Sequence, residues 1–292
     1  MTSPAVTGSA LALILIAAVF HAVWNIAAKR VQGDGYPFVW WYNAFSAAIW
    51  LPIGLVVLAH AGWPWSWGLL VGPLVSAVLH IGYALTLQTG YDRAELSVVY
   101  PVARGTGPLL TMAFALLVLG ERPGWWAALG GLVVIAGVAV VATGRSSGHR
   151  SRAVAGLRYG AATGLMIAAY TLWDNHSVTS LALLPISYFA LGSAWQTLLL
   201  APGLGRGSIR PLPVLKRWWR EVLVVALLSP AAYILVLQAM RTTPVALVAP
   251  VRESSIVIGA LLAWWLFKEP RPVRKLLGAV VVLAGIALIA TS

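Results

Sequence analysis

The sequence predicts an all-α integral membrane protein with ten transmembrane helices, arranged as two inverted five-helix repeats. Two observations lead to this fold class. Of the 292 residues, 60% are hydrophobic and 10% are charged, which is too apolar for one water-soluble core. The stretch 95–121 also recurs in altered form at 243–269. Such an internal repeat is strong evidence of architecture.

The two copies align on their closing glutamates, Glu121 and Glu269, and this alignment places Arg104 over Arg252. An apolar segment follows each copy, and its glycines keep the same offset of 148 residues. The aligned glycines are Gly130 with Gly278 and Gly137 with Gly285.

A hydrocarbon core about 30 Å thick requires ~20 apolar residues per helix. Because backbone groups inside a bilayer must bond to one another, apolar runs of this length indicate helices. Tryptophans crowd the ends of these runs, as expected for anchors at the headgroup level. Ten segments qualify: 9–28, 36–59, 67–88, 96–119, 124–143, 158–178, 180–201, 220–240, 244–267 and 273–290.

The basic residues predict the orientation. Of the 20 Lys and Arg residues, all but four fall on one side of the predicted membrane. Arg122 and Arg241 lie on the other side, and Arg104 and Arg252 lie inside the membrane. The positive-inside rule then places both termini outside the cytoplasm and the loops 144–157 and 202–219 inside. We therefore expect a multi-pass protein of the cell (inner or plasma) membrane.

Five helices per half is an odd number, so the second copy must insert upside down relative to the first, as in many secondary transporters. The predicted domains are a first repeat at 1–143, a basic cytoplasmic linker at 144–157 and a second repeat at 158–292.

The stretches YPVARGTGPLL…LGERP and APVRESSIVIGALLAWWLFKEP, with the glycine-rich segments after them, resemble EamA-type domains of the drug/metabolite transporter superfamily. The resemblance covers about residues 9–290. It implies a transporter rather than an enzyme, with export as the direction. Members of that superfamily export amino acids, drugs and metabolites, and some relatives exchange phosphorylated compounds.

An ionisable side chain inside a spanning helix costs ~2.5–3.5 kcal/mol and is a functional candidate by default. Arg104 is the strongest candidate, because it lies near the middle of its helix on one face with Tyr100. Pro101 and Pro108 flank it, so we expect a kink or unwinding there that frees backbone groups for a midplane site. The alternative is an arginine locked to a carboxylate for packing.

Arg252 and Glu253 are neighbours in sequence, so they point ~100° apart around a helix. Either they pair sideways, or one faces the cavity and the other a neighbouring helix. If Glu253 faces the cavity, it could carry the coupling proton, because burial disfavours the charged form of a carboxyl group. Asp174, whose counterpart in the first half is Asn25, could do the same or bind a substrate ammonium. Otherwise Asp174 is a carboxylate wetted near the interface.

The remaining candidates for substrate binding are histidines and aromatic residues on the first, third and sixth predicted helices. Lone histidines on such faces are commonly hydrogen-bonded packing residues. Together with these rings they would also suit a half-aromatic cavity for an amphipathic ligand. The candidates are His21, Trp24, His80, Tyr83 and Trp173.

No cofactor or metal is predicted, because no His/Asp/Glu group has metal-ligand spacing and the chain contains no cysteine. The net charge of +12 follows the topology rule and does not indicate nucleic acid. The expected partners are a small-molecule substrate, the lipid bilayer and protons, with a monomer as the functional unit. Glu121 and Glu269 are expected to favour the first turn of the helix that follows each.

The leading hypothesis is a secondary transporter, an exporter of a small polar metabolite, that works by alternating access around a midplane cavity. Two arginines and two carboxylates are close to balanced, which suits a zwitterion or carboxylate such as an amino acid. The alternatives are a transporter of a phosphonate, sugar phosphate or other organic anion, a cationic drug exporter, and a membrane enzyme that acts on lipid-linked substrates.

Overall fold

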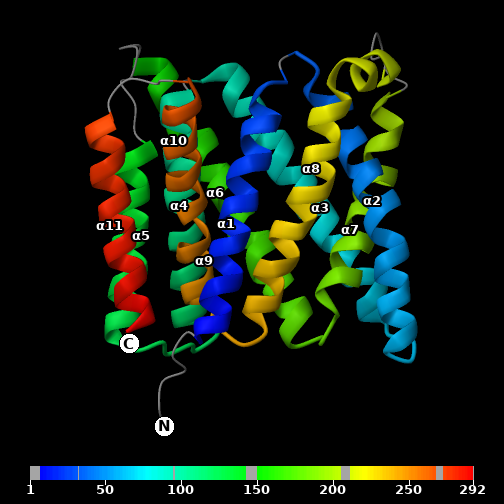
Figure 1. Ribbon diagram of the computed structural model, residues 1–292, viewed down its shortest axis with the longest axis horizontal. Helices are drawn as coiled ribbons and strands as arrows, with labels where there is room; N and C mark the ends of the chain where they lie inside the picture. The colour runs from blue at the N-terminus through cyan, green and yellow to red at the C-terminus, as the bar shows by residue number, and fades with distance from the viewer. Residues whose placement is uncertain are drawn as a thin grey trace.

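The computed structural model describes residues 7–31, 33–94, 96–142, 150–204, 211–267 and 272–291. The regular structure in these ranges is helical throughout (Figure 1). The helices are α1 (Gly8–Lys29), α2 (Gly35–His60), α3 (Trp67–Arg93), α4 (Leu96–Leu117), α5 (Trp125–Ala142), α6 (Arg150–Thr179), α7 (Pro185–Leu204), α8 (Pro211–Met240), α9 (Val245–Arg252), α10 (Ser254–Phe267) and α11 (Pro272–Ala290).

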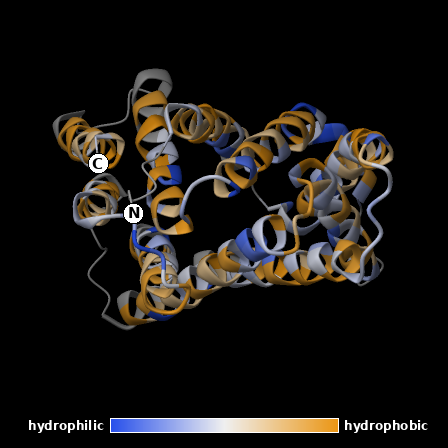
Figure 2. Ribbon diagram, turned by 90° about the horizontal axis from the view of Figure 1, so that it is seen from below, coloured by the Kyte–Doolittle hydropathy of each residue, from blue (hydrophilic) through white to orange (hydrophobic). Residues whose placement is uncertain are grey.

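The helices form one bundle, in which successive helices run in opposite directions and α10 continues the direction of α9 (Figure 1). The start of α1 and the end of α11 lie at the same, lower end of the bundle in that view. Figure 2, seen from this end, shows hydrophobic residues on the outward-facing sides of most helices.

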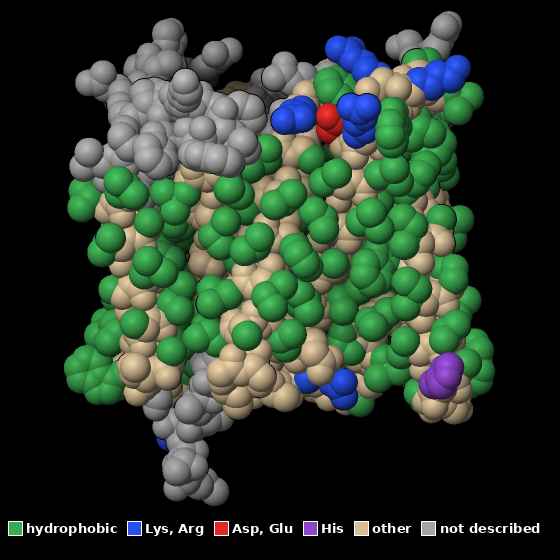
Figure 3. Space-filling model, viewed as in Figure 1, with side chains coloured by type: hydrophobic (Ala, Val, Ile, Leu, Met, Phe, Trp, Pro, Cys, Tyr) green, Lys and Arg blue, Asp and Glu red, His purple; other side chains and the backbone are tan. Residues whose placement is uncertain are grey.

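Four helices in the described ranges are long and apolar enough to cross a membrane: Gly8–Ala28, Gly35–His60, Trp67–Leu87 and Pro211–Met240. Three shorter apolar helices, Val102–Leu117, Trp125–Val140 and Leu276–Ala290, accompany them. The flank of the bundle is largely apolar between its two ends (Figure 3), and such a band suits a hydrocarbon surrounding.

The two copies of the repeat meet directly where α5 packs against α11. A Cβ atom built on Gly130 would lie 2.7 Å from the carbonyl oxygen of Gly285, and one built on Gly285 would lie 2.7 Å from that of Gly130. A Cβ atom on Gly137 would lie 3.0 Å from the carbonyl oxygen of Gly278. Only glycine permits this approach, which follows the small-residue packing common between membrane helices.

The expected unwinding of the helix around Arg104 is wrong, because α4 is a continuous helix through both prolines. The interruption occurs in the second copy instead, where Glu253 separates α9 from α10. The amide of Glu253 bonds to the carbonyl of Pro250, three residues back, at 3.0 Å. This tighter turn ends the α-helical pattern. The predicted segment 244–267 is therefore two helices, and every residue of α9 is buried.

Candidate functional site

A buried ionic cluster lies where α9 ends. Glu253 accepts from two guanidinium groups, with Arg104 Nη1 at 3.1 Å from Oε2 and Arg252 Nη2 at 3.4 Å from Oε1. The three residues are 8%, 3% and 1% exposed for Arg104, Arg252 and Glu253. Glu253 lies between two cations in a low-dielectric surrounding, where charges interact strongly. Each buried charge therefore needs its partner for compensation. The sideways pair of Arg252 and Glu253 is thus present, and Arg104 from the other repeat joins it.

A second buried charge, Asp174 on α6, is 0% exposed. The hydroxyl of Tyr188 donates to its Oδ1 and that of Tyr233 to its Oδ2, both at 2.6 Å. His80 Nε2 lies 3.9 Å from Oδ2. The alternative of a carboxylate wetted at the interface is wrong, because α7 and α8 supply phenols that replace water as hydrogen-bond donors.

Tyr170 connects the two charged groups. Its ring stacks on His80, with centroids 4.1 Å apart and planes at 27°. The guanidinium carbon of Arg252 lies 5.9 Å from the same ring, and Arg252 Nη1 donates to Thr171 at 3.5 Å. A cation over a ring face is attracted by the ring quadrupole. The ionic cluster and Asp174 therefore share one aromatic wall, to which Tyr83 also belongs at 5.7 Å from Tyr170.

The candidates on α1 form a smaller group. The rings of His21 and Trp24 meet edge to face at 4.8 Å, and the amide of Asn25 donates to the carbonyl of His21 at 2.6 Å. Within the described residues, His21 Nδ1 and Trp24 Nε1 are buried without a hydrogen-bond partner. Asn25 borders a cavity of about 50 Å³ that Arg104 and Tyr83 also line. This cavity can hold water, but it is far smaller than ligand pockets of about 300–1,000 Å³.

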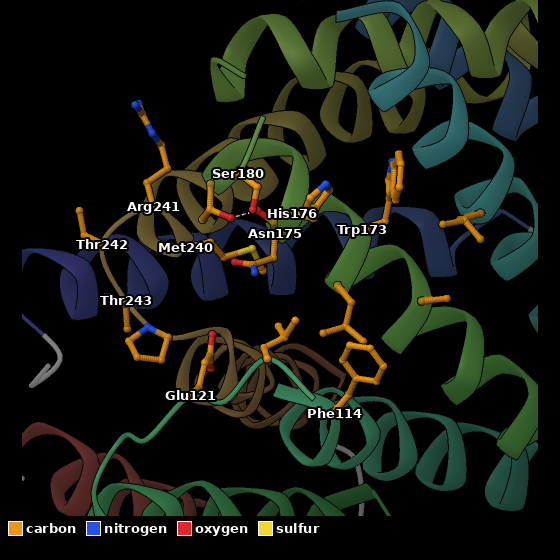
Figure 4. A pocket seen from close by; sticks show the side chains of 16 residues that line it. Phe114, Glu121, Trp173, Asn175, His176, Ser180, Met240, Arg241, Thr242 and Thr243 are labelled. Carbon is orange, nitrogen blue, oxygen red and sulfur yellow. Dashed lines mark hydrogen bonds between the residues drawn. The ribbon is translucent and has the colours of Figure 1, made fainter. Parts of the chain in front are cut away.

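A much larger pocket, of about 870 Å³, lies at the ends of α4, α6 and α8 and the start of α9. Figure 4 shows the amide of Asn175 inside it, with Trp173 and Phe114 at one end. Thr243 also lines it, and its buried hydroxyl has no partner among the described residues. The pocket reaches Ala169 and Trp173, which directly precede Tyr170 and Asp174 respectively in α6.

Several sequence-predicted residues lie apart from the charged groups or outside the described part. Trp173 donates to the carbonyl of Gly72 at 2.9 Å and borders the large pocket. The side chain of Tyr100 lies outside the described part of the chain, as does Glu269. Within the described residues, no three of His, Cys, Asp and Glu lie close enough to hold a metal ion.

The expectation for Glu121 needs correction. Its carboxylate does not serve the helix that follows it but accepts from the amides of Val245 and Ala246, at 3.0 and 2.9 Å. These are the first two residues of α9, in the other repeat. The physical preference for an acid at a helix N-terminus holds, but the fold brings a different helix to the glutamate.

Four residues at these sites were not predicted from the sequence: Tyr188, Tyr233, Thr171 and Asn175. Tyr188 and Tyr233 stand in apolar runs of α7 and α8, where a phenol resembles a packing residue. A signal was available, because a fully buried carboxylate such as that of Asp174 requires donors and tyrosines offer them deep in a helix bundle.

Comparison with known proteins identifies the family of this chain. The model of the EamA-like transporter family matches residues 8–143 and 154–291. The chain therefore belongs to the EamA-like transporter family and is a membrane transporter.

A solved structure, described only as the crystal structure of a protein, is 16% identical to this chain, covers 98% of it and matches over 97% of its own length, with a TM-score of 0.77. At this identity the likeness concerns the fold. No curated protein matches the sequence.

Proposed function

We propose that this chain is a ten-span secondary transporter that moves a small zwitterionic or carboxylate metabolite, such as an amino acid, by alternating access. One observation carries the proposal: Arg104, Glu253 and Arg252 form a buried cluster at an interrupted helix, one aromatic wall away from Asp174. Interrupted helices with charges at mid-depth form the substrate sites of many transporters.

The charges of the site suit a ligand with both signs. The cluster of two arginines and one glutamate carries one net positive charge, so a substrate carboxylate can compete with Glu253 for a guanidinium. Asp174 then meets the substrate ammonium, or carries the coupling proton as the alternative to Glu253. The rings of Tyr170, His80 and Tyr83 provide the apolar part of the wall.

The two cavities support a path to this site. The turn between α8 and α9 lies at the lower end of the bundle in Figure 1, and its residues, Arg241 among them, line the pocket of about 870 Å³. Beside Arg104 only about 50 Å³ is free. We infer a conformation open toward the lower end, with substrate moving past Asn175 and Trp173.

The net positive charge of the ionic cluster also favours a second candidate, an organic anion such as a phosphonate or sugar phosphate. Here both guanidiniums would face the substrate, and Asp174 would serve the proton alone. The two candidates differ in whether an ammonium group is needed for binding.

We further propose that the upper end, where most described basic side chains lie (Figure 3), faces the cytoplasm. Both termini then lie outside the cytoplasm, in the inner or plasma membrane. We propose export as the direction from the family resemblance, since the orientation of the chain does not set it. One chain holds both repeats, so a monomer is sufficient.

The test is a ligand screen by thermal shift on purified protein in detergent, with wild type, Arg104→Ala and, as the control, Arg122→Ala at the exposed lower end. Amino acids, carboxylates, phosphonates, sugar phosphates and quaternary amines are compared. The zwitterion proposal expects stabilisation by amino acids that Arg104→Ala abolishes and Arg122→Ala keeps. Stabilisation by phosphonates or sugar phosphates alone supports the anion candidate, and stabilisation by quaternary amines alone overturns both.

A further inference from the structure

The first two turns of α8 form an element separate from the transport site. Trp218 has non-helical backbone angles, φ −118° and ψ 22°, and the turns before it bend away from the rest of the helix. In Figure 1 these yellow turns run across the upper end of the bundle. A surface helix at this depth lies at the level of the lipid headgroups.

The inner side of this segment is fixed to the bundle. Trp218 Nε1 donates to Asp34 Oδ2 at 3.0 Å, and Trp41 Nε1 donates to the carbonyl of Pro211 at 2.7 Å. Val214 is buried in a small apolar cluster with Phe38. The bend is therefore held in place by the start of α2.

The outer side is basic and apolar together. Lys216, Arg217 and Arg220 are exposed, and none of them forms an ion pair with an acidic side chain of the described residues. Leu212 and Trp219 beside them are 62% and 49% exposed. Charged and apolar groups on one exposed surface suit a partner that is both anionic and apolar.

The cations are held at the height of the tryptophan rings. The guanidinium of Arg217 lies 4.9 Å from the ring of Trp218, and that of Arg220 lies 5.3 Å from the ring of Trp219. Tryptophan prefers the headgroup region of a bilayer, so these contacts place both guanidiniums at the depth of lipid phosphates. Arginine can bind a phosphate with two parallel hydrogen bonds.

We propose that this surface, formed by Lys216, Arg217 and Arg220 with Trp219 and Leu212, binds anionic phospholipids of the adjoining leaflet. The lipid phosphate and glycerol headgroup bind the three cations, and the acyl chains lie along Leu212 and the apolar flank below. Each basic residue near an anionic surface strengthens binding by about fivefold. The site is independent of the proposed substrate.

The experiment uses the full chain in detergent with added phosphatidylglycerol or phosphatidylcholine. Native mass spectrometry measures the lipid that the protein retains, and thermal unfolding measures the shift in melting temperature. The proposal expects phosphatidylglycerol to bind more tightly than phosphatidylcholine. The triple variant Lys216→Gln, Arg217→Gln, Arg220→Gln should lose about a hundredfold in affinity for phosphatidylglycerol. The matched control, Arg122→Gln with Arg241→Gln at the opposite end, should keep it.

Two further arms make the result decisive. A variant that preserves charge, Lys216→Arg with Arg220→Lys, should retain phosphatidylglycerol even where the triple variant folds poorly, and loss in this variant overturns the proposal. Equal retention of the two lipids by wild type also overturns it. Glycerol phosphate, which has no acyl chains, should give no stabilisation, and stabilisation equal to that by phosphatidylglycerol would indicate a soluble anion instead.

Discussion

Glu253 is the residue on which the buried charges of the two repeats meet. Its two oxygens accept from Arg104 of the first repeat and from Arg252 of the second. Removing one partner of a buried ion pair is strongly destabilising because the other charge stays buried without compensation. Loss of Glu253 should therefore destabilise the protein more than loss of either arginine, since the glutamate pairs with two cations.

We predict that Glu253→Gln lowers the melting temperature more than Arg104→Gln does. Loss of a partner from a buried pair costs about 3–5 kcal/mol. The Glu253 variant removes the carboxylate from both guanidiniums, whereas the Arg104 variant leaves Glu253 paired with Arg252. Thermal unfolding in one detergent checks this order, with exposed Arg122→Gln as the control. An Arg104 variant as unstable as the Glu253 variant would contradict the sharing of the carboxylate.

Among the elements, the antiparallel pair of α5 and α11 shows how the repeat builds its own interface. Gly130 touches Gly285 and Gly137 touches Gly278. The repeat relates Gly130 to Gly278 and Gly137 to Gly285, so the two contacts are one contact seen twice. A change at either glycine therefore acts on the same kind of backbone approach.

We predict that Gly130→Ala and Gly285→Ala each destabilise the bundle, because the new methyl group would lie 2.7 Å from a backbone oxygen of the other helix. Overpacking of this kind costs about 1–3 kcal/mol. Gly192→Ala on α7 is the matched control, since a Cβ atom built there would lie 3.8 Å from its nearest neighbour, the carbonyl oxygen of Pro73. Alanine at this position is expected to be neutral or stabilising. Melting temperatures of the three variants decide the matter, and equal values would refute the close approach.

At the scale of the molecule, topology is the property most directly open to test. The chain has no cysteine, so single cysteines can be introduced without background. We predict that Ser66→Cys, in the turn between α2 and α3, reacts with a membrane-impermeant maleimide in intact cells. Arg30→Cys, at the end of α1, should react only after permeabilisation. The reverse pattern would overturn the proposed orientation.

The sequence predicts the helical class and the repeat well, because apolar length and internal similarity are local properties of the chain. It also places Arg104, Arg252 and Glu253 inside spanning helices, but it leaves Asp174 open between a site residue and a carboxylate wetted near the interface. It does not predict their partners, since the contact of Tyr188 and Tyr233 with Asp174 depends on how α6, α7 and α8 pack. The same limit explains the break at Glu253, because prolines occur in both copies but only one copy is interrupted.

The short helix α9 lies between two anchors of the first repeat. Its first amides are held by Glu121, its end is held through the contact of Glu253 with Arg104, and it packs mainly against α4 and α5. In the sequence α9 belongs to the second repeat, but by its contacts it is attached to the first. A rocking motion between the repeats would thus carry α9 with α4, and the chain would bend at Pro244 and at Glu253, one joint on each side of an eight-residue rod.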